Sequence, residues 1–321
     1  MAFEQGLVLV SGANGYLAMH CVDQLLKKGY KVRGTVRSQA KVSEVVNLFP
    51  EHKDSLEVIV VEDMVKDGAF DQAVVGCTAI LHVASPVIFA KENPIDNVIT
   101  PAIRGTTNVL KSAMEYGSNV KRVVVTSSFA AVRNDSYGPD YAYTENDWNV
   151  ESRPEAGGME SYRASKAMAE KAAWKFMGTE KPTFKLTVIN PVWIIGPSIS
   201  NTVNTTTGLI LEMLKGGPIQ PSWMGFVDVR DVARAHIIAL ENPATAGQRY
   251  ICCGTVKSFP EVATILSKMY PKEPVVAQNG EFPPVPRINT AKIEKEMDFS
   301  FIPFEQTLRE TADQVLALEK K

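Results

Sequence analysis

A tyrosine and a lysine, Tyr162 and Lys166, are spaced for acid–base chemistry. Residues four apart share one face of a helix, so the phenol and the ammonium can point into one pocket. A phenol with a pKa of about 10 transfers protons poorly at neutral pH, and a nearby cation lowers that pKa by stabilising the phenolate. The spacing alone is weak, because one tyrosine of nine with a lysine four residues later is unremarkable.

A pair of serines upstream strengthens this interpretation. Ser127 and Ser128 follow the apolar run Val123–Thr126. Functional groups of a parallel sheet emerge at the carboxyl ends of its strands. Either hydroxyl could therefore hold a substrate oxygen beside Tyr162.

A glycine-rich turn near the amino end predicts a dinucleotide site. Gly12-x-x-Gly15-x-x-Ala18 lies between a strand-like run and a helical pattern. Gly12 suits a tight turn, Gly15 permits close approach of a pyrophosphate, and a small residue at 18 lets the helix pack on the sheet. The alternative is a plain glycine-rich turn. Other residues of this turn that we expect to contact a cofactor are Asn14, Tyr16 and Leu17.

The end of the second predicted strand indicates which dinucleotide is bound. NAD sites carry an acidic residue about 20 positions after the glycines, whereas an arginine there accepts the 2′-phosphate of NADP. This chain has Arg37 at that place and Lys41 one helical turn later. The guanidinium matches a phosphate bidentately, so NADP(H) is favoured. In the alternative interpretation Arg37 is a solvated surface charge.

The surrounding elements form a repeated pattern of buried strand and helix. Unbroken Val/Ile/Leu runs alternate with segments of helical length, which predicts an α/β fold, a doubly wound parallel sheet of the Rossmann type. The predicted strands are 7–10, 31–37, 56–61, 79–84, 120–125 and 184–189. Leu17, Cys21 and Leu25 lie on one face of the first helix, which should stop at Gly29.

The length of 321 residues allows two domains. We predict an NADP-binding Rossmann domain from residues 1–191 and 226–253, and a smaller substrate-binding lobe from 192–225 and 254–321. The lobe should cover the carboxyl edge of the sheet, where ligands of such sheets bind.

Taken together, these motifs resemble the extended short-chain dehydrogenases/reductases. The resemblance covers nearly the whole chain and is carried by the glycine turn, by Thr126-Ser127-Ser128 and by Tyr162-x-x-x-Lys166. Segments 82–86, 123–132, 165–176 and 190–197 are similar to the dihydroflavonol reductases and the fungal methylglyoxal and carbonyl reductases.

The resemblance implies NADPH-dependent reduction of aldehydes and ketones. Tyr162 would be the general acid, Lys166 would bind the nicotinamide ribose and lower the Tyr162 pKa, and Ser128 rather than Ser127 would hold the substrate oxygen. The family pattern places further cofactor contacts at Asp63, Met64, Ala84, Ser85, Pro191, Val192 and Thr206. Candidate apolar walls of the substrate pocket, each of which could equally be core, are Val87, Phe129 and Trp193.

One departure and two alternatives bear on the activity. Dihydroflavonol reductases have a flavonoid-contacting Asn five residues after the serine, and this chain has Arg133 instead, which argues against flavonoid reduction. A nucleotide-sugar epimerase or dehydratase of the same fold usually has an acid after the second strand, which is missing here. A dinucleotide-sensing regulator without turnover typically loses the Tyr or the Lys, and both are present.

Composition excludes other classes of function. The formal net charge is -2, with 34 basic and 36 acidic residues, so no surplus of positive charge favours nucleic acid. No apolar run reaches the roughly 20 residues of a membrane span and the first residues do not resemble a signal peptide, so we expect a cytoplasmic protein. As an oligomeric state we expect a monomer or a homodimer. The four cysteines and four histidines show no disulfide framework and no zinc-type spacing, which predicts no metal site.

Four polar residues have a structural interpretation. Asp228 and Asp231 match a helix N-cap and the third residue of that helix. His82 ends a buried strand and His236 lies in an amphipathic helical pattern, so we expect packing roles for both.

Overall fold

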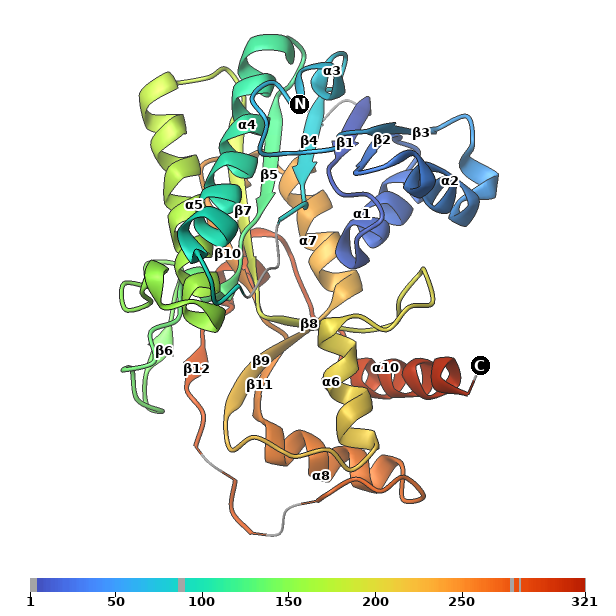
Figure 1. Ribbon diagram of the computed structural model, residues 1–321, viewed down its shortest axis with the longest axis vertical. Helices are drawn as coiled ribbons and strands as arrows, with labels where there is room; N and C mark the ends of the chain where they lie inside the picture. The colour runs from blue at the N-terminus through green and yellow to red at the C-terminus, as the bar shows by residue number, and fades with distance from the viewer. Residues whose placement is uncertain (1–4, 86–89, 278–279, 283, 321) are drawn as a thin grey trace.

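The computed structural model describes residues 5–85, 90–277, 280–282 and 284–320. In this part of the chain a seven-stranded parallel sheet lies between layers of helices, with a smaller three-stranded sheet below it (Figure 1). The main strands are β1 (Leu7–Val10), β2 (Lys31–Val36), β3 (Leu56–Val60), β4 (Ala79–His82), β5 (Arg122–Thr126), β7 (Lys185–Pro191) and β10 (Arg249–Cys252). The predicted α/β fold class is confirmed.

The strand order creates a crevice at the centre of the sheet. The order is β10-β7-β5-β4-β1-β2-β3, so the chain reverses its direction of winding between β1 and β4. In open α/β sheets, ligands bind outside the carboxyl ends of the strands at this switch point. The turns after β1 and β4 therefore define where a site is expected.

Helices cover both faces of the main sheet. Helices α4 and α5 pack together on one face, and α1 and α7 pack together on the other (Figure 1). The helices of this part are α1 (Tyr16–Lys27), α2 (Gln39–Leu48), α3 (Asp71–Val74), α4 (Thr100–Tyr116), α5 (Gly158–Glu180), α7 (Val229–Glu241) and α9 (Ala291–Glu296). Short helical turns are η1 (Pro50–His52), η2 (Ile95–Ile99), η3 (Phe129–Ala131), η4 (Pro154–Ala156) and η5 (Pro243–Thr245).

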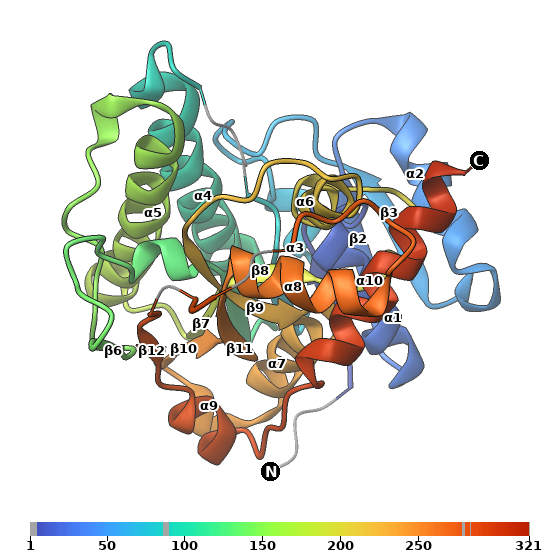
Figure 2. The ribbon, with the colours of Figure 1, turned by 90° about the horizontal axis from the view of Figure 1, so that it is seen from below.

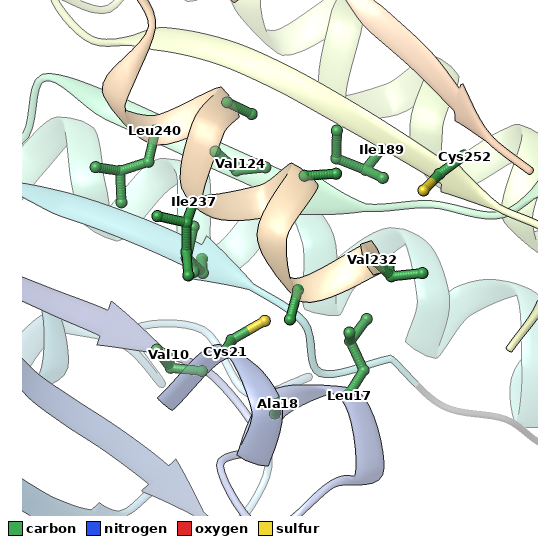
Figure 3. Packing of buried hydrophobic residues seen from close by; sticks show 14 of the residues in the cluster. Val10, Leu17, Ala18, Cys21, Val124, Ile189, Val232, Ile237, Leu240 and Cys252 are labelled. Carbon is green, nitrogen blue, oxygen red and sulfur yellow. The ribbon is translucent and has the colours of Figure 1, made fainter. Parts of the chain in front are cut away.

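The predicted apolar face of the first helix is buried in the core. Leu17 and Cys21 of α1 point toward Val232 and Ile237 of α7, above the central strands (Figure 3). Burying such side chains stabilises the fold by roughly 1.5–3 kcal/mol each. Helix α1 ends at Lys27, and Gly29 follows with a φ of 86°, a backbone conformation that glycine adopts without strain.

The smaller sheet and its helices lie beyond the carboxyl edge of the main sheet (Figures 1 and 2). Its elements are β8 (Trp193–Ile195), β9 (Trp223–Asp228), β11 (Thr255–Ser258), α6 (Thr205–Leu214), α8 (Phe259–Met269) and α10 (Phe304–Glu319). A two-stranded pair joins β6 (Ala142–Tyr143) to β12 (Arg287–Ile288). Strand β9 spans the predicted boundary at residue 226, and the division into two domains stays a prediction.

Several side chains have the structural roles expected for them. Asp228 caps α7 by accepting a bond from the Arg230 N–H at 2.8 Å, and Asp231 accepts one from the Ile302 N–H at 2.7 Å. The buried His236 is bonded to Thr126 at 2.7 Å. Cys21, Cys77, Cys252 and Cys253 are buried free thiols.

Within the described residues, no helix is long and apolar enough to cross a membrane, and no three metal-ligating side chains are grouped together.

Candidate active site

The turn after β1 is tight at both of its glycines. Gly12 has a φ of 67°, and a Cβ there would come within 3.0 Å of the Ala84 Cβ. The Gly15 N–H donates to the Gly12 carbonyl at 2.7 Å, and a Cβ on Gly15 would come within 3.1 Å of that same oxygen. The turns after β1 and β4 therefore meet closely, as a site at the switch point requires.

The start of α1 is open, in the sense that no side chain caps it, which is also true of α2, α4 and α5. Gly15 is its N-cap and forms no side-chain cap bond, and the first turn carries no acidic residue. Side chains close the starts of α6, α7 and α8, from Asn204, Asp228 and Ser258. The first-turn N–H groups that follow Gly15, together with the positive end of the helix dipole, fit a pyrophosphate.

A buried serine and histidine tie this turn to β4. The Ser11 Oγ accepts a bond from the Ala84 N–H at 2.9 Å and lies 3.0 Å from the His82 Nδ1. Burial, followed by the charge of Lys166, lowers the pKa of His82 to about 3, so its ring is neutral at physiological pH. His82 thus helps to fix the turn, which agrees with the packing role expected for it.

Three other residues of the turn lie in different surroundings. The Tyr16 hydroxyl donates to the Gly196 carbonyl at 2.7 Å, so it ties α1 to the segment after β8. Leu17 is 7% exposed and packs between α1 and α7 (Figure 3). Asn14 is partly exposed between the glycines. The Leu17 side chain therefore belongs to the core, and only the backbone of Leu17 could contact a cofactor.

The predicted phosphate-selecting residues follow β2. Arg37 is exposed directly after Val36, the last residue of that strand, and forms no ion pair within the described residues. Lys41 lies in α2 and is paired with Glu44 at 2.7 Å. Arg37 is therefore the better placed of the two to receive a 2′-phosphate.

The two residues expected beside an adenine follow β3. The Asp63 Oδ1 accepts a bond from the Val65 N–H at 2.9 Å. Met64 packs against Gly105 of α4, and its carbonyl accepts a bond from the Asn108 side chain at 3.0 Å. The segment is thus held in place at the carboxyl edge of the sheet.

Ser128 and Tyr162 meet through their hydroxyl groups. Tyr162 is hydrogen-bonded to the Ser128 side chain, which also accepts a bond from the Ala130 N–H at 3.1 Å. Ser127 is buried away from Tyr162, and its Oγ donates to the Glu170 Oε2 at 2.6 Å. The backbone alternation after β5 therefore brings Ser128, rather than Ser127, to the tyrosine.

Lys166 completes the group from one helical turn further along α5. Its Nζ donates to the Ser85 Oγ at 2.5 Å and lies 5.5 Å from the centre of the Tyr162 ring. Burial lowers the pKa of Lys166 to about 8.

The predicted lowering of the Tyr162 pKa by Lys166 stays a prediction. Burial raises the pKa of Tyr162, and the hydrogen bond from Ser128 opposes that rise. The Lys166 ammonium donates a hydrogen bond to the Ser85 hydroxyl. Desolvation of the phenolate is therefore the largest influence on the Tyr162 pKa.

The remaining predicted residues lie around the end of β7. Pro191 ends that strand, and Val192 is buried against Gly225. The Trp193 Nε1 donates to the Thr206 carbonyl at 3.3 Å, and the Thr206 hydroxyl is used within the cap of α6, bonded to Asn204 at 2.8 Å. This engagement makes Thr206 a poor candidate for a phosphate contact.

Phe129 and Val87 are the two other residues predicted to line the substrate pocket. Phe129 is 4% exposed and meets the Tyr143 ring edge-on with centroids 5.2 Å apart, so it is core. Val87 lies outside the described residues.

Sequence reasoning missed a buried polar cluster behind the serines. Glu170, 1% exposed, contacts Ser127, Asn190 and Arg249. Its position four residues after Lys166 was a usable signal, because that spacing continues the same helix face. Asn190 and Arg249 offered none, since their contacts connect distant segments of the chain.

The fold and site define a Rossmann-type protein with a Ser-Tyr-Lys group beside an open helix start. Residues 8–253 match the model of the NAD dependent epimerase/dehydratase family, and the chain belongs to that family. The resemblance to the extended short-chain dehydrogenases/reductases is thereby confirmed.

Named relatives cover most of the chain. A putative NADPH-dependent methylglyoxal reductase of Candida albicans is 36% identical over 342 residues, covering 96% of this chain and 98% of its own. Tetraketide alpha-pyrone reductase 1 of Arabidopsis thaliana is 39% identical over 280 residues, covering 84% and 83%. The structure of yeast methylglyoxal/isovaleraldehyde reductase complexed with NADPH superimposes with a TM-score of 0.91 at 31% identity, covering 98% of this chain and 99% of the yeast chain.

Proposed function

We propose that this protein is an NADPH-dependent reductase that converts aldehydes or ketones into alcohols. The observation that carries the proposal is the meeting of Ser128, Tyr162 and Lys166 on the side of the sheet where the open start of α1 lies. The reductases named among the relatives support the same class of reaction.

Tyr162 supplies the proton of the proposed reaction. NADPH, when bound, supplies a hydride to the carbonyl carbon. The Tyr162 hydroxyl gives its proton to the carbonyl oxygen, and Ser128 holds that oxygen by a hydrogen bond. Since burial raises the pKa of Tyr162, the phenol is protonated throughout the neutral range, as a general acid must be.

Other residues would hold the cofactor. Gly12 and Gly15 would admit the pyrophosphate, Lys166 would bind the nicotinamide ribose, and Arg37 would bind the 2′-phosphate. Asp63 and Met64 would flank the adenine. Ala84, Ser85, Pro191 and Val192 would lie along the cofactor, and Trp193 would border a small-molecule carbonyl substrate.

A substrate and cofactor screen tests the proposal. Oxidation of NADPH and of NADH is followed with methylglyoxal, a diketone, an aryl ketone, a β-keto ester and a dihydroflavonol. We expect turnover with at least one carbonyl and a preference for NADPH. Absence of NADPH oxidation with all of them would contradict the proposal, whereas turnover excludes a purely sensory role.

Substitutions of Arg37, directly after β2, and of Lys31, the first residue of β2, test the preference for NADPH over NADH. Arg37→Ala should raise the KM for NADPH by tenfold or more, because a charge-assisted contact contributes about 1.5–3 kcal/mol, and should leave the KM for NADH within twofold. Lys31→Ala, at the exposed first residue of the same strand, is the control and should change neither value. Equal effects of Arg37→Ala on both cofactors would refute the role of Arg37.

A further inference from the structure

Glu170 is a buried carboxylate on the same helix as Tyr162 and Lys166. It lies four residues beyond Lys166 and is 1% exposed. Its oxygens accept bonds from the Ser127 Oγ at 2.6 Å, from the Asn190 Nδ2 at 2.7 Å and, less closely, from the Trp174 Nε1 at 3.3 Å. The carboxylate is thus surrounded by donors from α5 and from the ends of two strands.

Two of these donors hold the segment that carries Ser128. Ser127 precedes Ser128 directly, so its bond to Glu170 fixes the backbone on one side of that residue. The Asn190 Nδ2 that donates to Glu170 also donates to the Ser128 carbonyl at 3.2 Å. Glu170 therefore acts on Ser128 by two routes without touching it.

Arg249 supplies the opposite charge that a buried carboxylate needs. It lies at the start of the edge strand β10, 2.7 Å from a Glu170 oxygen as an ion pair, with a hydrogen bond to the other oxygen at 3.1 Å. Its second amino group is held by the Glu145 and Asp147 carbonyls at 3.0 and 2.8 Å. The cation is therefore fixed and in turn fixes Glu170.

We propose that Glu170 is a positioning residue, which holds Ser128 against the Tyr162 hydroxyl through Ser127 and Asn190. The inference rests on the proposed reductase function. A reacting group must be held within roughly 0.5 Å of its productive place, and a displacement of about 1 Å can cost 100-fold in rate. Loss of the carboxylate should thus slow turnover of protein that remains folded.

The test compares two variants that change bonds to the same carboxylate. Glu170→Gln keeps the side-chain volume but removes the charge, and Trp174→Phe removes only the indole bond. Turnover is expressed per NADPH-binding site, counted by fluorescence titration, so that unfolded protein does not contribute. We expect Glu170→Gln to lower kcat by about 10- to 100-fold with the NADPH Kd within threefold, and Trp174→Phe to leave kcat within twofold.

A double variant tests the route through Ser127. We expect Ser127→Ala to lower kcat at least fivefold, and Glu170→Gln combined with Ser127→Ala to lose less than the product of the single losses, because the two groups act together. Losses that multiply in full would overturn action through Ser127. If Glu170→Gln does not fold, Ser127→Ala decides alone, and a loss below fivefold overturns the proposal.

The outcomes separate this inference from the function on which it rests. Wild-type protein without NADPH-dependent reductase activity would overturn both. Active wild-type protein together with a Glu170→Gln variant that loses stability, yet keeps kcat per site within twofold, would overturn the positioning role alone.

Discussion

Two buried cations, Lys166 and Arg249, lie near the same helix but in opposite electrostatic surroundings. Lys166 is 6% exposed, and the bond that its ammonium donates goes to a neutral partner, the Ser85 hydroxyl. Arg249 is 8% exposed and faces the Glu170 carboxylate at 2.7 Å. Among the described residues, the charge of Arg249 is therefore compensated by a carboxylate and that of Lys166 is not.

The difference separates the reactive part of the site from the part that supports it. Burial lowers the pKa of Lys166 to about 8, so the charged ammonium makes the folded protein less stable. Functional sites commonly contain such local destabilisation, whereas buried ion pairs fix geometry. The two cations should accordingly respond in opposite ways to the same substitution.

The largest expected effect on stability is at Arg249. Arg249→Met would leave the Glu170 carboxylate buried without its counter-charge, so the free energy of unfolding should fall by about 3–5 kcal/mol. Urea denaturation measures this loss. Arg287→Met, at an exposed arginine of β12, is the control and should stay within about 0.5 kcal/mol of wild type. A loss below about 1 kcal/mol for Arg249→Met would show that the pair does not stabilise the fold.

The same substitution at Lys166 should have the opposite sign. Lys166→Met removes a buried charge, so the free energy of unfolding at pH 7 should rise by up to about 3 kcal/mol, the equivalent of the lowered pKa. Turnover should be lost in the same variant, since Lys166 is proposed to bind the nicotinamide ribose. A less stable Lys166→Met protein would contradict the contrast between the two cations.

The pH dependence of stability tests whether the Lys166 charge causes the expected difference in the free energy of unfolding. The pKa of this group is lowered from 10.5 to about 8 on folding, so between these values the unfolded chain binds more protons and wild-type stability gains from rising pH. The advantage of Lys166→Met over wild type should therefore shrink from about pH 8 to about pH 10.5. Denaturation at pH 7, 9 and 10.5 measures the difference, and an advantage that stays constant would assign it to another cause.

Local sequence patterns predicted the parts of the site that local physics determines. The Val/Ile runs marked the strands because strands buried on both faces need unbroken apolar sequence. Gly12 and Gly15 were recognisable because few other residues fit so tight a turn, and Tyr162 with Lys166 because helix geometry brings them together.

Long-range contacts could not be predicted in the same way. Glu170 and Arg249 are 79 residues apart, and nothing in either segment specifies the other. The raised pKa of Tyr162 depends on burial by several elements, and the place of Phe129 in the core depends on its contact with the Tyr143 ring. These features arise from tertiary packing, which overrides local pattern.

The proton donor is the central claim, and Tyr162→Phe tests it most directly. This variant keeps the ring and its packing but loses the transferable proton, so kcat for carbonyl reduction should fall by at least 100-fold while the Kd for NADPH stays within threefold. Tyr30→Phe, which removes a hydroxyl bonded to Glu241 on α7, is the matched control and should keep full turnover. A Tyr162→Phe enzyme whose kcat stays within threefold of wild type would contradict the role of Tyr162 as the general acid.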